Sequence, residues 1–184
     1  MSIETEIKVK IEDVDGFCSH LCGLDSKVLA ERHFEDNFLL DFPDRKLQSS
    51  QCLLRVRFAL ECGLLTFKGP PRRDGIFKTR EELETKFEDR ATGLEIFERI
   101  GMEVCFRYQK YRREFSLDQV CVAVDETPIG NYAEFEGTEE RILALAERMG
   151  IAESRFLRLS YYSLYLEHCR KTAEAPGFMV FSDP

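Results

Sequence analysis

Three pairs of glutamates recur along the chain with one residue between their members. They are Glu4 and Glu6, Glu82 and Glu84, and Glu134 and Glu136. Residues two apart in a β-strand point to the same face, so each pair would hold two carboxylates roughly 7 Å apart. Their repulsion costs about 2 kcal/mol at an effective dielectric constant of about 20, and nearly vanishes in open water. The pairs therefore indicate either a solvated face of a sheet or a site for a divalent cation, which prefers carboxylate oxygens.

Lysine and arginine residues follow the same alternation in other strand-like segments. They are Lys8, Arg55, Arg57, Lys68, Arg80, Lys110 and Arg112, although segment 103–116 carries charge on both of its faces. Asp125 shares a side of its segment with Cys121 and Ala123, away from three valines. Guanidinium and ammonium groups bind phosphate oxygens, and Mg²⁺ commonly bridges carboxylates and substrate phosphates. A polyphosphate with bound metal would satisfy both the basic and the acidic residues.

Simpler interpretations exist for several neighbouring residues. Lys10, Glu12, Lys78 and Glu114 share the alternation but lie near strand ends, where contact with solvent explains them. The three histidines, His20, His33 and His168, lack the spacing of metal ligands and are expected to be structural or surface residues. The sequence contains no Walker A run, no Gly-x-Ser-x-Gly and no His-Glu-x-x-His, so no other catalytic motif competes.

Composition limits the class of protein. The chain has 184 residues, 43% of them apolar and 33% charged, which indicates one folded domain with a substantial core. A net charge of −8 disfavours nucleic acid as the main partner. No apolar run is long enough to span a membrane, and no signal peptide is visible, so a cytoplasmic protein is expected. Seven cysteines without Cys-x-x-Cys spacing support neither a disulfide framework nor a zinc site.

The pattern of apolar residues predicts strands interrupted by helices. Strands are expected at 2–12, 28–42, 51–60, 63–69, 76–87, 103–116, 118–126 and 131–137, and helices at 13–23, 90–100, 138–150 and 161–171. Residues 1–171 would form a single domain, and the tail, 172–184, would be loosely held. A sheet of about eight strands either exposes its charged face to water or curls and closes. If it closes, the lumen is charged, and the helices must cover an apolar outer wall.

Ordered sequence blocks resemble the CYTH domains, the family of triphosphate tunnel metalloenzymes. The blocks are Glu4-x-Glu6-x-Lys8, Leu54-Arg55-Val56-Arg57, Thr66-Phe67-Lys68-Gly69-Pro70, residues 80–84, Tyr108-Gln109-Lys110-Tyr111-Arg112, residues 124–130, Ala133-Glu134-Phe135-Glu136-Gly137 and Ser160-Tyr161. One such block is a weak signal, but the ordered set covers roughly residues 2–166. The resemblance implies an α+β fold, namely a closed eight-stranded antiparallel β-barrel, or tunnel, with a charged lumen that is covered by about four helices.

The resemblance also implies roles for the charged residues. Glu4, Glu6, Glu134 and Glu136 would be ligands of Mg²⁺ or Mn²⁺. Lys8, Arg55, Arg57, Lys68, Arg80, Lys110 and Arg112 would bind the substrate. Glu82, Glu84, Asp125 and Lys68 are the catalytic candidates. The match is looser at 33–41, to which no catalytic role is assigned.

The function expected from this resemblance is metal-dependent hydrolysis of a triphosphate, either inorganic triphosphate, thiamine triphosphate or a nucleoside triphosphate. A class IV adenylyl cyclase, which makes cyclic AMP and pyrophosphate from ATP, is the first alternative. A polyphosphate- or nucleotide-binding module without turnover is the second. A sheet whose solvated charged face contacts other proteins is a third interpretation, and it predicts no dependence on metal. The expected partner is a small molecule that contains a triphosphate, rather than nucleic acid or membrane, and a homodimer is a further expectation.

Overall fold

The computed structural model describes residues 2–60, 62–72 and 75–182. This part of the chain contains eight β-strands and five α-helices. The strands are β1 (Ser2–Ile11), β2 (Lys27–Asp41), β3 (Leu53–Ala59), β4 (Cys62–Lys68), β5 (Lys78–Phe87), β6 (Glu103–Leu117), β7 (Val120–Thr127) and β8 (Gly130–Glu136). The helices are α1 (Val14–Gly23), α2 (Lys46–Ser49), α3 (Arg90–Arg99), α4 (Glu139–Arg148) and α5 (Tyr161–Thr172). A short 3₁₀ turn, η1 (Glu153–Arg155), precedes α5.

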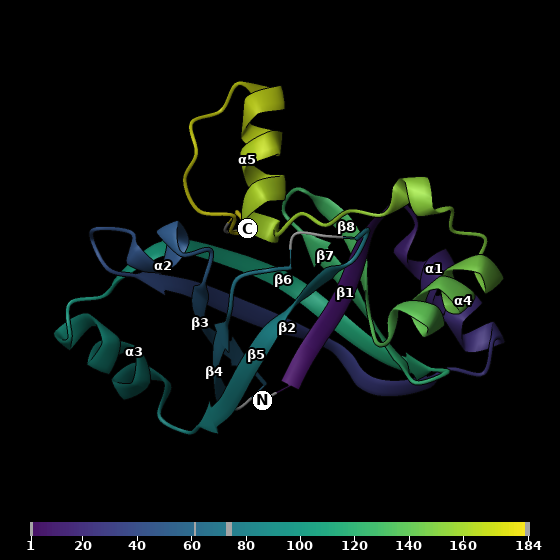
Figure 1. Cartoon of the computed structure of the whole chain (residues 1–184), viewed down its shortest axis with the longest axis horizontal. Coiled ribbons are helices and arrows are strands. Elements are labelled where there is room, and N and C mark those ends of the chain that lie inside the picture. Colours follow the sequence, from purple (N-terminus) through teal and green to yellow (C-terminus); the bar gives the residue numbers. More distant parts are fainter. Residues whose placement is uncertain (1, 61, 73–74, 183–184) are drawn as a thin grey trace.

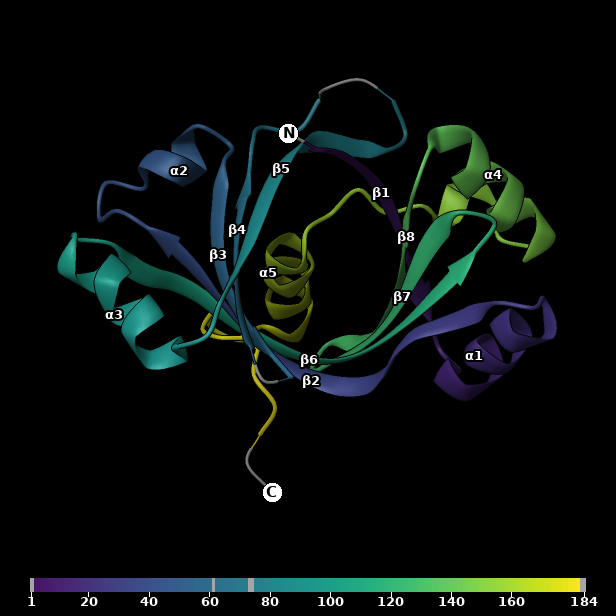
Figure 2. The same cartoon turned by 90° about the horizontal axis from the view of Figure 1, so that it is seen from below.

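The strands form a closed antiparallel barrel, which confirms the predicted fold class. Around the barrel the order is β1-β5-β4-β3-β2-β6-β7-β8, and β8 returns to pair with β1 (Figure 2). Glu6 lies opposite Glu136 and Lys8 opposite Glu134, while Glu4 lies opposite Arg80 on β5. Because side chains alternate along each strand, this register places the charged residues of neighbouring strands in one inward-facing layer.

The outer wall of the barrel is apolar and is covered by helices in two places (Figure 1). Ile7, Val9, Val122 and Phe135 pack under α1 and α4, with Leu21 and Ile142 from those helices. On the other side, Leu40, Val56 and Met102 form the buried centre of a second cluster, against which Leu94 and Phe97 of α3 pack. The prediction of about four covering helices missed α2, a single turn whose start is fixed by Asp41, which accepts hydrogen bonds from the backbone N–H groups of Leu47 and Gln48.

The fifth helix stands at one end of the barrel, and the view along the lumen shows it nearly end-on within the ring of strands (Figure 2). The segment that leads into α5 pairs with the wall, because Leu157 exchanges two backbone hydrogen bonds with Lys8. Ser160 caps the helix by accepting a hydrogen bond from the N–H of Ser163. The N-terminal end of α5 therefore faces the lumen.

The C-terminal tail differs from the loosely held segment that was expected. Met179 bridges to β6, donating its N–H to the carbonyl of Arg107 and accepting from the N–H of Gln109. Its side chain is 1% exposed and packs with Phe106 and Tyr108. The tail covers an edge of β6 that β7 does not reach, since β7 pairs only from Tyr111 onward. The sequence of the tail shows no strand-like alternation of apolar residues, so this pairing could not be predicted from it.

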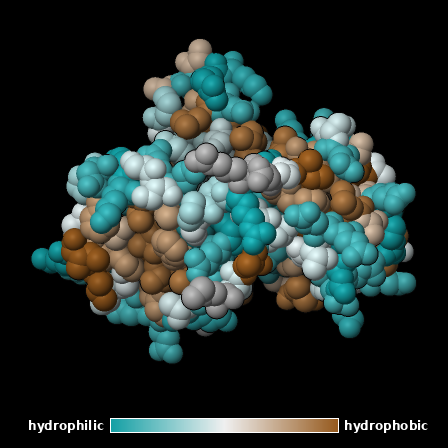
Figure 3. All heavy atoms as spheres, viewed as in Figure 1, coloured by the Kyte–Doolittle hydropathy of each residue, from teal (hydrophilic) through white to brown (hydrophobic). Residues whose placement is uncertain are grey.

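Part of the outer surface stays apolar. Figure 3 shows brown residues on the side of α3 and over the strands beside it, and Ile96 of α3 and Ile100 directly after it are both exposed. The homodimer expected from the sequence would need such a surface, and it stays a prediction. In the described part of the chain, no helix has the length and apolarity needed to cross a membrane.

The packing of the tail leads to a stability prediction. We expect Met179→Ala to lower the free energy of unfolding by about 2–5 kcal/mol, because a buried side chain is removed. The neighbouring Phe178 is 51% exposed, so Phe178→Ala should change that free energy by no more than about 0.5 kcal/mol. Equilibrium denaturation in urea measures both values. Equal small effects in the two variants would mean that the tail is not docked.

Candidate active site in the barrel lumen

The lumen and its mouth form one cavity of about 840 Å³. Its volume is within the range of sites for small organic ligands, about 300–1,000 Å³. Thirteen of the predicted site residues line it, namely Glu4, Glu6, Lys8, Arg55, Arg57, Lys68, Arg80, Glu82, Glu84, Lys110, Arg112, Glu134 and Glu136. The barrel register brings these residues together from six strands, while Asp125 lies behind the lining and is 0% exposed. Their individual roles stay predictions.

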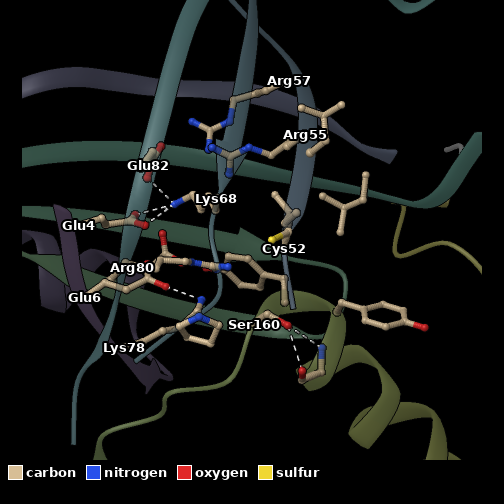
Figure 4. A pocket seen from close by; sticks show the side chains of 18 of the residues that line it. Glu4, Glu6, Cys52, Arg55, Arg57, Lys68, Lys78, Arg80, Glu82 and Ser160 are labelled. Carbon is tan, nitrogen blue, oxygen red and sulfur yellow. Dashed lines mark hydrogen bonds and ion pairs between the residues drawn. The ribbon is translucent and has the colours of Figure 1, made fainter. Parts of the chain in front are cut away.

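The acidic pairs of β1 and β5 face lysines. Lys68 of β4 reaches both Glu4, at 2.6 Å, and Glu82, at 2.7 Å (Figure 4). Lys78 forms an ion pair with Glu6 at 2.6 Å (Figure 4). These contacts are possible because Lys68 lies opposite Glu82, and Lys78 opposite Glu6, in neighbouring strands. The solvent contact predicted for Lys78 is wrong, since its side chain is only 12% exposed inside the cavity.

Charge is unevenly compensated on this side of the lumen. Burial raises the pKa of Glu4 to about 7, and Glu6 and Glu82 add to the shift while Lys68 opposes it. Burial also opposes ionisation of Glu6, but Lys78 and Lys8 outweigh it and hold the pKa of Glu6 well below its usual value. The pKa of Glu136 is raised by partial desolvation and by neighbouring Glu82 and Glu6, although Lys68 acts in the opposite direction. An additional cation near Glu4 and Glu136 would therefore be stabilised.

Among the described residues, the side chain of Arg80 has no hydrogen-bond or ion-pair partner, although the residue is only 8% exposed. The other two arginines on this side of the cavity, Arg55 and Arg57, do have partners, but none of these contacts is shorter than 3.1 Å. Arg55 contacts Thr66 at 3.2 Å and lies 3.8 Å from Glu84, and Arg57 contacts Glu35 at 3.2 Å. Burial lowers the pKa of Lys78, and Arg80 and Lys8 lower it further against the effect of Glu6. Positive charge is thus crowded around Arg80, where an anion would be stabilised.

A second network fills the opposite side of the barrel. Asp125 accepts from Arg112 Nε at 2.7 Å and Nη2 at 2.6 Å, from Lys110 at 3.0 Å and from the hydroxyl of Tyr161 at 2.5 Å. Glu134 is paired with both Lys8 and Arg112. Because both Asp125 oxygens are occupied by donors and the group is enclosed, this arrangement favours a role in holding Arg112 and Lys110 over the catalytic role that the sequence suggested.

One buried acid that was not predicted from the sequence is Glu35 of β2. It is 1% exposed and lies 3.2 Å from Arg57, 3.4 Å from Lys110 and 3.6 Å from His33. Those cations hold its pKa well below the usual value, although burial opposes the shift. The neighbouring Asp36 is also charged but pairs outside the lumen with Arg107. Alternation could not decide between Glu35 and Asp36, because both faces of this strand carry a carboxylate.

The carboxylates of the lumen are oxygen donors of the kind that a divalent metal prefers, but in the part of the chain that the structure describes they do not converge as the ligands of a metal site would. Glu6 and Glu136 are direct cross-strand partners, and Glu136 has no ion-pair partner among the described residues. Two carboxylates opposed in this way repel each other unless a cation lies between them. In the described ranges, however, no three His, Cys, Asp or Glu side chains converge as a metal site. The carboxylates of Glu4, Glu6 and Glu134 turn instead toward lysines and Arg112.

The lumen becomes apolar toward α2 and α5. Inward residues run from Arg57 and Arg55 to Leu53 along β3, and from Lys110 through Tyr108 to Phe106 along β6. Leu39 of β2, Leu47 of α2 and Tyr162 of α5 also line this part of the cavity. We call these residues, Leu39, Leu47, Leu53, Phe106 and Tyr162, the apolar mouth. The cavity thus joins a charged chamber to one in which these apolar side chains lie beside polar ones, among them Gln48, Gln51 and Ser163.

Comparisons with known proteins agree with this architecture. The CYTH domain model matches residues 2–154. A Methanocaldococcus jannaschii protein that carries the name "putative adenylate cyclase" is 28% identical over 173 residues, which cover 88% of this chain and 98% of that protein. A Vibrio parahaemolyticus structure described in the same words has a TM-score of 0.77 at 24% identity, covering 88% of this chain and 96% of its own.

A structure from Hippeastrum superposes with a TM-score of 0.68 at 17% identity, covering 96% of this chain and 98% of its own. That protein is described as an adenylyl cyclase candidate with a dominant triphosphatase activity. At these sequence identities, the likeness to solved structures shows the fold alone. Membership of a family is shown by the match to the family model. Since the matched residues span most of the barrel, this chain belongs to the CYTH domain family.

Proposed function

We propose that this protein is a divalent-metal-dependent hydrolase of a triphosphate substrate. The observation that carries the proposal is Arg80, a buried arginine that lines the cavity without a partner in the described residues. A buried guanidinium without an anion is costly. Phosphate oxygens accept two parallel hydrogen bonds from such a group, so a polyphosphate would remove this cost. The family and the activity described for the Hippeastrum relative favour the same substrate class.

The basic residues around Arg80 would hold successive phosphates. Lys78 lies on β5, the strand of Arg80, whereas Arg55 and Arg57 lie on β3, which β4 separates from β5; each of the three lines the cavity. Their cations are compact or planar donors fixed on a rigid barrel. Phosphoryl transfer depends mainly on positioning and on stabilising negative charge. These side chains would therefore orient the substrate and neutralise charge that develops on the oxygens around the reacting phosphorus.

The metal would be Mg²⁺ or Mn²⁺, held by Glu6 and Glu136 with help from Glu4 and Glu134. Bound there, it would supply charge neutralisation to the phosphate oxygens and lower the pKa of a bound water. Lys68 contacts both Glu4 and Glu82, so it links this carboxylate group to β4 and β5. Glu84 accepts a hydrogen bond from Thr66 at 2.7 Å and is partly exposed, so it could receive a proton from water that enters the lumen.

Cyclisation of ATP is a second candidate, favoured by the apolar mouth. Two of its residues, Leu53 and Phe106, continue the rows of basic side chains on β3 and β6, where a group attached to the triphosphate would extend. A cyclase needs that group to be held in one pose, whereas a hydrolase needs only the phosphates. The two relatives named for adenylate cyclase activity belong with this alternative. A binding module without turnover would use the same basic residues.

Metal dependence distinguishes hydrolysis from the interpretation based on a solvated sheet. We expect inorganic triphosphate to be cleaved with Mg²⁺ or Mn²⁺ and not after chelation, and Glu136→Gln to lower kcat/KM at least about 100-fold because a metal ligand is lost. Release of orthophosphate measures the rate. Glu139→Gln, at an exposed position on α4, is the matched control and should keep the parental rate. Full activity of Glu136→Gln would remove the metal assignment.

Removal of the unpaired arginine separates binding from stability. Arg80→Gln should raise the dissociation constant of inorganic triphosphate about 10- to 100-fold, because one charged donor to the phosphates is lost. The free energy of unfolding should stay equal or increase, since no ion pair is broken. Calorimetric titration and urea denaturation give the two values. Arg99→Gln on the exposed face of α3 is the control, and equal affinities in both variants would contradict the proposed site.

Substrate preference follows from the apolar mouth. Leu53→Ala should lower kcat/KM for ATP about fivefold, because apolar contact with the organic group is lost. The same variant should cleave inorganic triphosphate at the parental rate, since Leu53 lies beyond the basic residues of β3. Product analysis also separates orthophosphate from cyclic AMP with pyrophosphate. Equal losses on both substrates would mean that Leu53 supports the barrel and not the substrate's organic part.

A further inference from the structure

One aromatic residue that belongs to none of the barrel strands contacts the basic residues of the lumen. Tyr161 is the first residue of α5, and its side chain is buried inside the end of the barrel. We propose that Tyr161 is a positioning residue, which holds Lys8, Lys110 and Arg112 in the arrangement that receives the triphosphate. This inference rests on the proposed function, because it assigns how three of the substrate-binding cations are held.

The hydroxyl of Tyr161 acts through Asp125. It donates to Oδ2 of Asp125 at 2.5 Å, the oxygen that also accepts from Lys110 at 3.0 Å and from Arg112 Nη2 at 2.6 Å. Burial raises the pKa of the Tyr161 hydroxyl well above its usual value, and neighbouring Asp125 raises it further, so the hydroxyl keeps its proton. Three donors on one oxygen fix the carboxylate. Arg112 and Lys110 are fixed with it.

The ring of Tyr161 acts on two lysines. Lys8 Nζ lies 4.9 Å from the ring centroid, and Lys110 Nζ lies 5.1 Å from it. Ammonium groups are attracted to the face of an aromatic ring within about 6 Å. Tyr108 and Tyr132, each 5.8 Å from the Tyr161 ring between centroids, support its position. The ring thus keeps both ammonium groups at the lumen without neutralising their charge, as a carboxylate would.

The backbone around Tyr161 is tied to the barrel wall. Leu157 pairs with Lys8 through two backbone hydrogen bonds, so the segment before α5 is anchored at the residue whose side chain Tyr161 contacts. Arg158 donates to the carbonyls of Gly75 and Arg72 at 2.7 and 2.9 Å. Tyr161 is therefore the side chain through which α5 contacts these lysines. Within the described ranges, no other residue of α5 makes a hydrogen bond or ion pair to a charged lumen residue.

The test compares Tyr161→Phe and Tyr161→Leu with Tyr165→Phe. Tyr165 lies on the same helix, and its hydroxyl accepts a hydrogen bond from the N–H of Gly177 outside the lumen, so its loss controls for stability. We expect the dissociation constant of inorganic triphosphate, measured with chelator present, to rise about fivefold in Tyr161→Phe and about 30-fold in Tyr161→Leu. Tyr165→Phe should bind as the parent does. With metal present, KM should increase in the same order, from the parent to Tyr161→Phe to Tyr161→Leu, and kcat should change by a smaller factor than KM.

Several outcomes would overturn the inference. Parental affinity in Tyr161→Leu, or equal losses in Tyr161→Phe and Tyr165→Phe at matched melting temperature, would mean that Tyr161 only packs. If the parent protein binds no triphosphate, the proposed function fails, and the NMR shifts of the ε-methylene protons of Lys8 and Lys110 then decide the contact separately. In Tyr161→Leu these shifts should lose the displacement caused by the ring current. Unchanged shifts would show that the ring does not hold the lysines.

Discussion

Closing a sheet around charged side chains imposes the constraint on which the rest of this structure depends. Each carboxylate or cation that turns inward loses water, and its cost must be offset by an opposite charge or by hydrogen bonds. The barrel meets this requirement with pairs between neighbouring strands, such as Lys68 with Glu4 and Glu82, and Lys78 with Glu6. Removing either member of such a pair leaves a buried charge, so the pairs fix the strand register more than they add to net stability.

The alternation of charge along the strands made much of the lumen predictable. Side chains two apart share a face, so Arg55 and Arg57 or Glu134 and Glu136 had to point the same way once their segments were recognised as strands. Closure into eight strands followed from the family resemblance. The pairing partners did not follow, because they depend on register between strands distant in sequence. Lys78 is the plain example, since its ion pair with Glu6 joins residues 72 positions apart.

Other features were hidden for different physical reasons. Glu35 could not be separated from Asp36 by alternation, because each carboxylate faces a different cation on β6, Lys110 inside and Arg107 outside. The docking of Met179 depends on an edge of β6 that β7 leaves unpaired, and the pairing of these strands could not be predicted from the sequence of the tail. Tyr161 could have been a packing residue or could have pointed into a tunnel mouth, and only the placement of α5 decides between them. In each case the missing information is tertiary.

The two sides of the lumen differ in how easily their charges can be exchanged for a ligand. Around Asp125 the cations are already saturated, and Arg112, Lys110 and Tyr161 all donate to one enclosed carboxylate. Around Arg80 and Glu136 the charges lack partners or repel like charges nearby. An anion that enters with a cation gains at the second side without breaking contacts at the first. Under the proposed function, the saturated side would therefore hold its cations in fixed positions facing the substrate, and the unsaturated side would contribute most of the free energy of binding.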